Sequence, residues 1–254
     1  MYVPDVDHIA SQRLTPYLSH AHGDPNRAME LYLLDRKLSA AVFFEIGIVE
    51  VALRNAIDRA LVGKYGPDWP GNMALPVDRR TTENICEAWA QLPGSFTRER
   101  CTSGTMSGRL LAANMFRTWS NLPDEGTTTG LAAPRDRADH DLIWDRPTLL
   151  AAFPGSSLEA GGQGVQLTRK WVFDVVKEVH VLRNRIAHHE ALINGYSMPG
   201  MKDPSGHPLR RSIEEGVAAC RTLARIIDHH LEEFLTNDST AEKALADLRS
   251  AAHA

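Results

Sequence analysis

The 254-residue chain is poor in cysteine and in long apolar runs. Its three cysteines, Cys86, Cys101 and Cys220, are odd in number and lack the spacing of metal ligands, which predicts free thiols in a reducing cytoplasm. The most apolar stretch, Ala40–Leu53, contains two glutamates and is too short to cross a bilayer, and the opening residues lack the apolar run of a secretory leader. We therefore expect a cytoplasmic protein with no membrane partner.

A strong excess of charge of one sign is also absent. The formal net charge is −4, and the 24% charged and 43% hydrophobic residues are ordinary for a globular protein. A slightly acidic chain does not attract nucleic acid through its overall field, so any RNA binding must use local positive charge. One candidate region, for which a solvated surface is the alternative, comprises Arg169, Lys170, Arg183, Arg185, Arg210, Arg211, Arg221 and Arg225.

Several sequence signatures of catalysis are missing as well. The chain has no Gly-rich phosphate loop, no serine nucleophile elbow, no set of kinase motifs and no His-Glu-x-x-His pair. Nucleotide hydrolysis and acyl transfer are therefore poorly supported, and we predict no cofactor. His180 and the run His188–Glu190 carry metal-binding groups, but their spacing completes no set of ligands, so we predict no metal. The pair His229–His230 is predicted to lie on the surface or at a helix cap.

The chain does contain apolar residues that recur at three- and four-residue steps, which is the pattern of amphipathic helices. Long helices are predicted at residues 26–64, 167–193 and 209–235, and shorter ones at 8–18, 81–91 and 105–119. Asn194-Gly195 is the predicted stop of the 167–193 helix. Segments rich in proline, glycine or small polar residues predict loops at 67–79, 121–141, 154–164 and 195–208. The sequence therefore predicts an all-α fold with long core helices and irregular loop insertions.

We divide the chain into three parts. Residues 1–25 form an N-terminal segment, residues 26–235 one helical domain, and residues 236–254 a C-terminal tail that is rich in alanine and charge and is predicted to be helical. A chain of this length can bury a sizeable core.

The most informative stretch is Arg183–Glu190, with the sequence Arg-Asn-Arg-Ile-Ala-His-His-Glu. It lies near the end of the predicted 167–193 helix, which is apolar on one face for four turns and then becomes polar within seven residues. Asn184 and His188 are four residues apart and share a helix face, and Arg183 lies beside that face. The three side chains are therefore candidates for one shared cleft.

These residue types suit the cleavage of RNA without a metal. The ribose 2′-hydroxyl is a nucleophile next to the phosphate, and an enzyme must move its proton and stabilise charge on the phosphate. His188 is the predicted acid–base group because imidazole titrates near neutral pH, and His189 is a second candidate. Arg183 offers a fork of donors that matches phosphate oxygens, and the amide of Asn184 can position either group.

The polar helix end also has simpler explanations. Polar residues at the end of a helix often form a solvated face, and arginine near a helix C-terminus complements the helix dipole. Two alternatives to RNA cleavage therefore stay open. One is a non-catalytic helical module that binds RNA or a protein through its arginine and histidine face. The other is a structural interaction protein with no role in nucleic-acid binding.

The spacing Arg-Asn-x-x-x-His resembles the R-x4-H motif of ribonucleases of the HEPN superfamily. The segment Val181–Glu190 as a whole resembles the Abi-like (AbiD/AbiF) proteins of bacterial abortive infection. Further pieces follow in the order expected of that family and extend the resemblance over residues 10–235: Glu50–Ile57, Tyr65–Trp69, Phe116, Trp119, Leu142–Trp144 and Leu149–Pro154. The specific part of the resemblance is the Arg-Asn-x-x-x-His-His-Glu core.

The resemblance implies a HEPN-like helical bundle that is commonly a homodimer. It also implies a metal-independent endoribonuclease that acts as a toxin or in antiviral defence, with RNA as substrate and possible control by an antitoxin protein. Arg183, Asn184, His188 and His189 are then the predicted catalytic residues. Some toxins of this superfamily carry a modifiable tyrosine two residues after the histidine, where this chain has Glu190, so that mode of regulation is not expected.

Four further residues are predicted to bind the substrate. Arg185 and Glu190 belong to the motif stretch itself. Arg54 and Asn55 lie in Leu53-Arg54-Asn55-Ala56-Ile57, which repeats the pattern of Leu182–Ile186, although an arginine stands where the second copy has His188. The repeat suggests two core helices with related faces, and chance similarity is the alternative.

Overall fold

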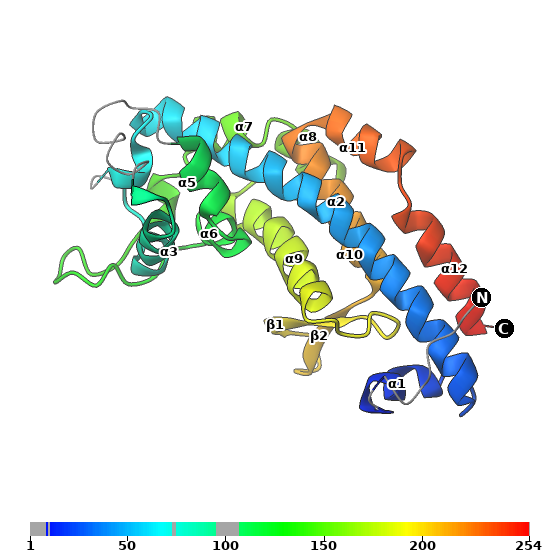
Figure 1. The fold of residues 1–254 in the computed structure, drawn as a ribbon. Helices are drawn as coiled ribbons and strands as arrows, with labels where there is room; N and C mark the ends of the chain where they lie inside the picture. Colours follow the sequence, from blue (N-terminus) through cyan, green and yellow to red (C-terminus); the bar gives the residue numbers. More distant parts are fainter. Residues whose placement is uncertain (1–8, 10, 73–74, 95–106, 254) are drawn as a thin grey trace. The chain divides into compact units, whose positions relative to one another are not determined.

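The computed structural model describes residues 9, 11–72, 75–94 and 107–253. The predictions for Cys101 and for the opening residues of the 1–25 segment lie outside the described residues. Within them the chain is predominantly α-helical and has one two-stranded sheet, which confirms the prediction of an all-α fold (Figure 1). No helix among these residues combines the length and the apolar character that crossing a membrane requires.

The described residues form helices along most of the chain and two short strands. In chain order the α-helices are α1 (Ser11–Leu18), α2 (Pro25–Tyr65), α3 (Arg79–Ala90), α5 (Ser107–Ala113), α6 (Phe116–Asn121), α7 (Arg146–Ala152), α8 (Ser156–Gly162), α9 (Arg169–Ala187), α10 (Ile213–Ile227), α11 (His229–Asn237) and α12 (Ala241–His253). Short 3-10 helices are η2 (Trp69–Gly71) and η3 (His140–Leu142), and the strands are β1 (Tyr196–Lys202) and β2 (Pro208–Arg211). The two strands pair antiparallel, with Tyr196 opposite Arg211.

The chain forms two compact units, and each combines segments that are distant in the sequence. The first unit comprises Met1–Ile48, Val181–Arg221 and Glu232–Ala254. The second comprises Val49–His180 and Thr222–Leu231. Helices α2, α9, α10 and α11 each contribute residues to both units.

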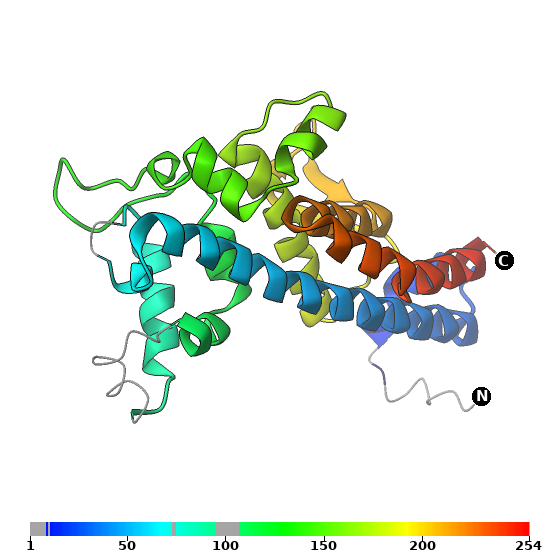
Figure 2. The same ribbon diagram turned by 90° about the horizontal axis from the view of Figure 1, so that it is seen from above.

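The core of the first unit is built around the N-terminal half of α2. The apolar stripe that the sequence predicts is buried there, with Leu31, Leu38, Val42 and Ile46 at most 1% exposed. Leu182 and Ile186 of α9 and Ile213 of α10 are buried in the same unit. Figures 1 and 2 show α12 alongside this half of α2, where Arg27 Nη2 donates a hydrogen bond to the carbonyl oxygen of Ala251 at 2.5 Å.

The core of the second unit is rich in aromatic side chains. Trp69, Phe116, Trp119 and Phe153 are at most 2% exposed. The indole of Trp69 donates to Asp58 of α2 at 2.8 Å, which satisfies a polar group that the core would otherwise leave unpaired. The aromatic residues of the family-like pieces therefore have a packing role in this unit.

Several segments differ from their predicted structure. The predicted 105–119 helix is interrupted at Asn114 and Met115, between α5 and α6, and its first two residues lie outside the described ones. The prediction of one helix over 209–235 is wrong in two places. Its first residues belong to strand β2 (Pro208–Arg211), and Asp228 divides the remainder into α10 and α11. Asp228 accepts the main-chain N–H of His230 at 2.9 Å, so its side chain starts a new helix. The predicted loop 195–208 contains strand β1, and the predicted loop 154–164 contains helix α8.

Candidate functional site

The motif stretch occupies the last turns of α9 and the turn that follows. The helix ends at Ala187, six residues before the predicted end at Ile193. Leu182 and Ile186 are buried, Arg183, Asn184 and Arg185 are half-buried, and His188 and His189 are exposed. The stretch therefore faces the core on one side and presents its polar residues outward.

The helix ends in a Schellman turn centred on His189. The N–H of His189 donates to the carbonyl of Ile186 at 2.9 Å, and the N–H of Glu190 donates to that of Arg185 at 3.0 Å. His189 has φ +56°, a left-handed conformation that is usually taken by glycine at this position. The predicted stop at Asn194-Gly195 is therefore wrong, because the chain turns away from the helix axis at His189.

Arg183 has an aromatic neighbour and an unused donor. Its guanidinium carbon lies 5.8 Å from the ring centroid of Phe43 on α2, which is cation–π distance. Its Nε is buried and has no hydrogen-bond partner among the described residues. Phe43 and its neighbour Phe44 are 42% and 64% exposed. Within the described residues, no hydrogen bond or ion pair joins Arg183 to His188 of the same chain.

Arg185 and Glu190, both predicted to bind substrate, bind each other. Arg185 Nη1 lies 2.8 Å from Glu190 Oε1 and 3.1 Å from Oε2. Arg185 Nη2 also donates to the carbonyl oxygen of Ser197 at 3.3 Å. The pair is 27% and 42% exposed, so the surrounding solvent weakens its attraction. Arg185 thereby links strand β1 to the turn at residues 186–190, which we call the motif turn.

A buried carboxylate on α2, which no sequence motif indicates, holds the residues that directly follow this turn. Asp35 of α2 is fully buried, and its Oδ2 accepts the N–H groups of Leu192 at 2.8 Å and Ile193 at 3.2 Å. The same oxygen accepts the hydroxyl of Tyr17 from α1 at 2.7 Å. Burial and the charge of Asp35 raise the pKa of Tyr17, so the phenol stays protonated and donates.

Arg36, which follows Asp35 on α2, also supports the motif turn. Arg36 Nη2 donates to the carbonyl oxygen of Glu190 at 2.7 Å and lies 3.0 Å from Asp35 Oδ1. A single Asp in the apolar stripe of α2, between Leu31 and Leu38, was the sequence signal for this arrangement. A polar residue on a buried helix face needs partners, and here they come from the motif turn.

A cavity of about 440 Å³ lies beside the motif turn in the first unit. Its walls come from α1, α2, the end of α9 with the turn after it, and the β1–β2 hairpin, and they include Arg185, His189 and Glu190. Arg13 of α1 donates to the carbonyl oxygen of His189 at 3.0 Å across this region. The motif residues therefore divide into two surroundings, with Arg183 against Phe43 and with Arg185, His189 and Glu190 at the cavity.

The remaining predicted site residues, Arg54 and Asn55, belong to the second unit. Arg54 is half-buried and its Nε has no hydrogen-bond partner among the described residues, while Asn55 is exposed. Their role as substrate-binding residues stays a prediction.

Most of the predicted basic region is used in local ion pairs. Arg221 is 6% exposed and pairs with the buried carboxylate of Glu45 at 2.6 Å, so it does not belong to an open surface. Other members also have carboxylate partners: Arg169 with Asp141, Lys170 with Asp174, Arg211 with Glu215, and Arg225 with Glu159. Arg183 and Arg210 have no ion-pair partner among the described residues.

One group of metal-capable residues is a buried structural network. Asp78, Asp124 and His140 lie close together in the second unit, but Arg80 bonds both carboxylates. His140 Nδ1 contacts the carbonyl oxygen of Asp124, and its Nε2 accepts the N–H of Asp78. Burial raises the pKa of each carboxyl, but hydrogen bonds to the carboxylates outweigh it. Those from the Thr81 N–H and Arg80 hold the pKa of Asp78 below its usual value, and those from His140, the Gly126 N–H and Arg80 do so for Asp124. The polar atoms therefore satisfy one another.

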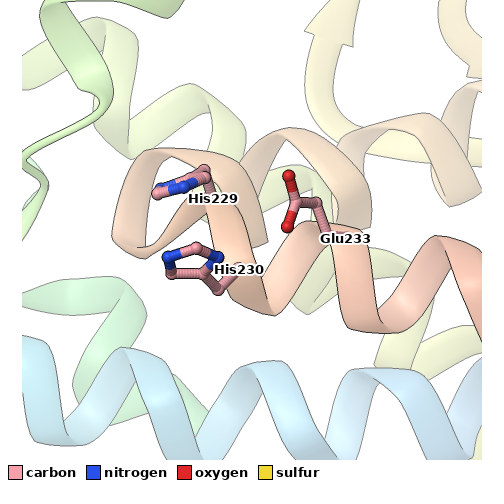
Figure 3. A group of neighbouring side chains, drawn as sticks. All are labelled: His229, His230 and Glu233. Atoms are coloured by element: carbon pink, nitrogen blue, oxygen red, sulfur yellow. The ribbon is translucent and has the colours of Figure 1, made fainter.

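The other group lies on the first turns of α11. Figure 3 shows the imidazoles of His229 and His230 side by side with Glu233 one turn further along. The two ring centroids are 3.8 Å apart, and all three side chains are exposed, as predicted for the histidine pair. Imidazole and carboxylate are ligands that zinc accepts, but the two histidines belong to the second unit and Glu233 to the first, so we treat these residues only as exposed side chains of α11.

Comparison of the chain with protein-family models, with curated proteins and with solved structures gave no match. The resemblance to Abi-like proteins therefore depends on the motif residues and the family-like pieces of the sequence alone.

Proposed function

We propose that the chain is a metal-independent endoribonuclease of the Abi-like, HEPN type, acting in an abortive-infection or toxin–antitoxin system. The observation that supports this proposal best is that the guanidinium of Arg183 has a donor unpaired in the part of the chain that the structure describes, and packs on an aromatic ring. Its buried Nε has no acceptor within the described residues, and its guanidinium lies on Phe43 at the polar end of α9. The guanidinium lies on the same helix end as the exposed His188, five residues earlier in the sequence, and its planar fork of donors is suited to phosphate oxygens.

In the proposed mechanism, His188 removes the proton of the ribose 2′-hydroxyl as the 2′-oxygen attacks phosphorus. The bond from phosphorus to the 5′-oxygen breaks, and a second imidazole, His189 or His188 of another copy, protonates the leaving oxygen. Arg183 stabilises the negative charge on the phosphorane-like transition state, and Asn184 positions one of these groups. The products are a 2′,3′-cyclic phosphate and a 5′-hydroxyl end.

We further propose a two-fold dimer as the active form, with Arg183 of one chain beside His188 of the other. The reason is that Arg183 and His188 make no direct bond within one chain of the described structure. The exposed side chain of Phe43, which lies against Arg183, and that of Phe44 beside it in the sequence offer apolar area that a second copy would cover.

The test is incubation of the purified protein with total RNA in EDTA. We expect the wild type to produce fragments with 2′,3′-cyclic phosphate ends. Arg183→Ala and His188→Ala should each lower the cleavage rate by at least about 100-fold, because each removes one of the groups that act on the transition state. Circular dichroism should show unchanged helicity in both variants.

Two matched controls come from residues outside the motif. Arg27 carries a partly buried guanidinium in the same unit, away from the motif, and His207 carries an exposed imidazole between the two strands of the hairpin. Arg27→Ala and His207→Ala should cleave at the wild-type rate. Equal cleavage by wild type and by an Arg183→Ala/His188→Ala double variant would end the nuclease proposal.

The exposed Phe43 and Phe44 also favour a second candidate, a non-catalytic module that binds RNA or a protein. That module predicts no cleavage by the wild type, with binding that survives His188→Ala and weakens in Arg183→Ala. The same purified variants therefore separate the two functions.

A further inference from the structure

The cavity beside the motif turn is lined by more positive than negative side chains. Its positive side chains come from three separate elements: Arg13 from α1, Arg185 from α9 and Arg210 from β2. Glu190 is the one carboxylate among the residues that line it, so three positive charges against one negative give a formal charge of +2 with His189 neutral. The whole chain carries −4. A concave positive site in an acidic protein concentrates anions at that place.

The three guanidinium groups are held in place by main-chain carbonyls of residues 189–197. Arg13 Nη1 bonds the carbonyl of His189 at 3.0 Å, and Arg185 Nη2 bonds that of Ser197 at 3.3 Å. Arg210 Nη2 bonds the carbonyls of Asn194 and Gly195 at 3.0 and 2.9 Å. Arg185 also bonds the carboxylate of Glu190, and Arg210 Nη1 donates to Ser197 Oγ at 3.1 Å. Each guanidinium has five N–H donors, so these bonds fix its position and still leave donors for an anion, most of them on Arg13.

The cavity also has an aromatic wall. Tyr32 of α2 lines it and is half-buried. The ring of Tyr17 packs edge-on against that of Tyr32, with centroids 5.8 Å apart, which restrains the orientation of the Tyr32 ring. Proteins that bind single-stranded nucleic acid combine guanidinium groups for the phosphate with an aromatic ring for the base. A volume of about 440 Å³ lies within the range of small-ligand sites.

We propose that this cavity binds one phosphorylated nucleotide unit, with its phosphate at Arg13, Arg185 and Arg210 and its base against Tyr32. This inference rests on the proposed RNA substrate, for which the cavity would hold a nucleotide next to the one that is cleaved. His189 and Glu190 line the cavity and directly follow His188, so a bound strand can continue from the cavity toward the motif helix. A free mononucleotide offers the same phosphate and base.

Binding is measured in the His188→Ala background, so the test does not depend on catalysis. The probe is a fluorescently labelled ten-nucleotide single-stranded RNA, followed by anisotropy, with adenosine 5′-monophosphate as competitor. We expect Arg13→Ala to weaken RNA binding about tenfold, because a charge-assisted hydrogen bond to phosphate is lost. Arg13→Lys, which keeps the charge, should bind within about threefold of the parent. Arg27→Ala is the matched control, because Arg27 lies outside the cavity and also bonds a main-chain carbonyl.

Displacement of the RNA by the mononucleotide, lost in Arg13→Ala, identifies a site that also takes free nucleotides. Binding of the RNA without such displacement identifies a site for a strand. Equal RNA affinity of the parent, Arg13→Ala and Arg27→Ala would overturn the cavity proposal and leave the nuclease proposal standing. If the RNA binds to none of these proteins, the cavity proposal is also overturned. The cleavage assay with the wild type then tests the proposed function separately.

Discussion

At the residue scale, the turn that carries His189 and Glu190 is held from outside the motif by the carboxylate of Asp35. Two main-chain N–H groups and the Tyr17 hydroxyl donate to one of its oxygens, and Arg36 lies against the other. Because Asp35 is fully buried, water cannot replace it if it is removed. The geometry of the proposed site therefore depends on a residue that would not touch the substrate.

Asp35→Ala should lower the free energy of unfolding by about 3–5 kcal/mol, because it leaves buried donors and the Arg36 charge unpaired. Urea denaturation measures this change. Asp238→Ala, which removes an exposed carboxylate of the same unit, should change stability by no more than about 0.5 kcal/mol. A similar small change in Asp35→Ala would show that the contacts of Asp35 do not stabilise the turn.

At the element scale, the hairpin β1–β2 depends on the backbone at Gly195. This residue has φ +68°, and a Cβ atom there would clash with the carbonyl oxygen of Arg211 on β2. Gly200 has a similar φ of +74°, but a Cβ atom there would meet no atom within 4 Å. The two glycines therefore separate the cost of the backbone conformation from the cost of a steric clash.

Gly195→Ala should destabilise the protein by about 2–4 kcal/mol, from the left-handed conformation and the clash together. Gly200→Ala should cost about 1 kcal/mol, from the conformation alone. Thermal or urea unfolding of both variants gives the comparison. Equal losses at the two positions would mean that the hairpin moves to accommodate the added methyl group.

The sequence predicted some elements well and others poorly, for physical reasons. Helix α2 was predicted to within one residue at each end, because its apolar positions keep a helical period throughout its length. The hairpin was missed because Pro199 and Gly200 interrupt the alternation that indicates strands. The sequence predicts the stop of α9 at Gly195 because glycine usually occupies the left-handed position after a helix, but His189 takes that position.

The candidate site could be predicted only in part, because a local sequence pattern shows the residues of one helix face but not those brought together by packing. Local spacing identified the polar end of α9, because residues three and four apart share a helix face. The cavity depends on Arg13, Tyr32 and Arg210, which lie far from the motif in sequence and come together only through the packing of α1, α2 and β2. No local pattern contains that information.

At the scale of the whole molecule, an ion pair between α10 and α12 links folding of the first unit to pH. Arg249 donates to both carboxylate oxygens of Glu214, at 2.5 and 2.8 Å. These hydrogen bonds lower the pKa of Glu214 to about 2 from its usual value of 4.5, although partial burial opposes the shift. A carboxyl whose pKa is lower in the folded protein stabilises the fold above its unfolded pKa.

The wild type should therefore be more stable than Glu214→Gln at neutral pH, and this difference should remain constant down to about pH 4.5. Between about pH 4.5 and pH 2 the difference should shrink, because protonation removes the charge in the wild type as well. Melting temperatures of the two proteins across this range give the measurement. A difference that does not change with pH would show that the charge of Glu214 is not what stabilises the helix pair.

The discontinuous make-up of the two units affects how the chain acquires its structure during synthesis. The ribosome delivers residues in order, yet the first unit needs Glu232–Ala254 and the second needs Thr222–Leu231. Neither unit has all of its segments until those late helices have emerged. A nascent polypeptide that already carries the motif helix therefore still lacks part of both cores, and the proposed nuclease would gain its finished form only after residues 222–254 have emerged.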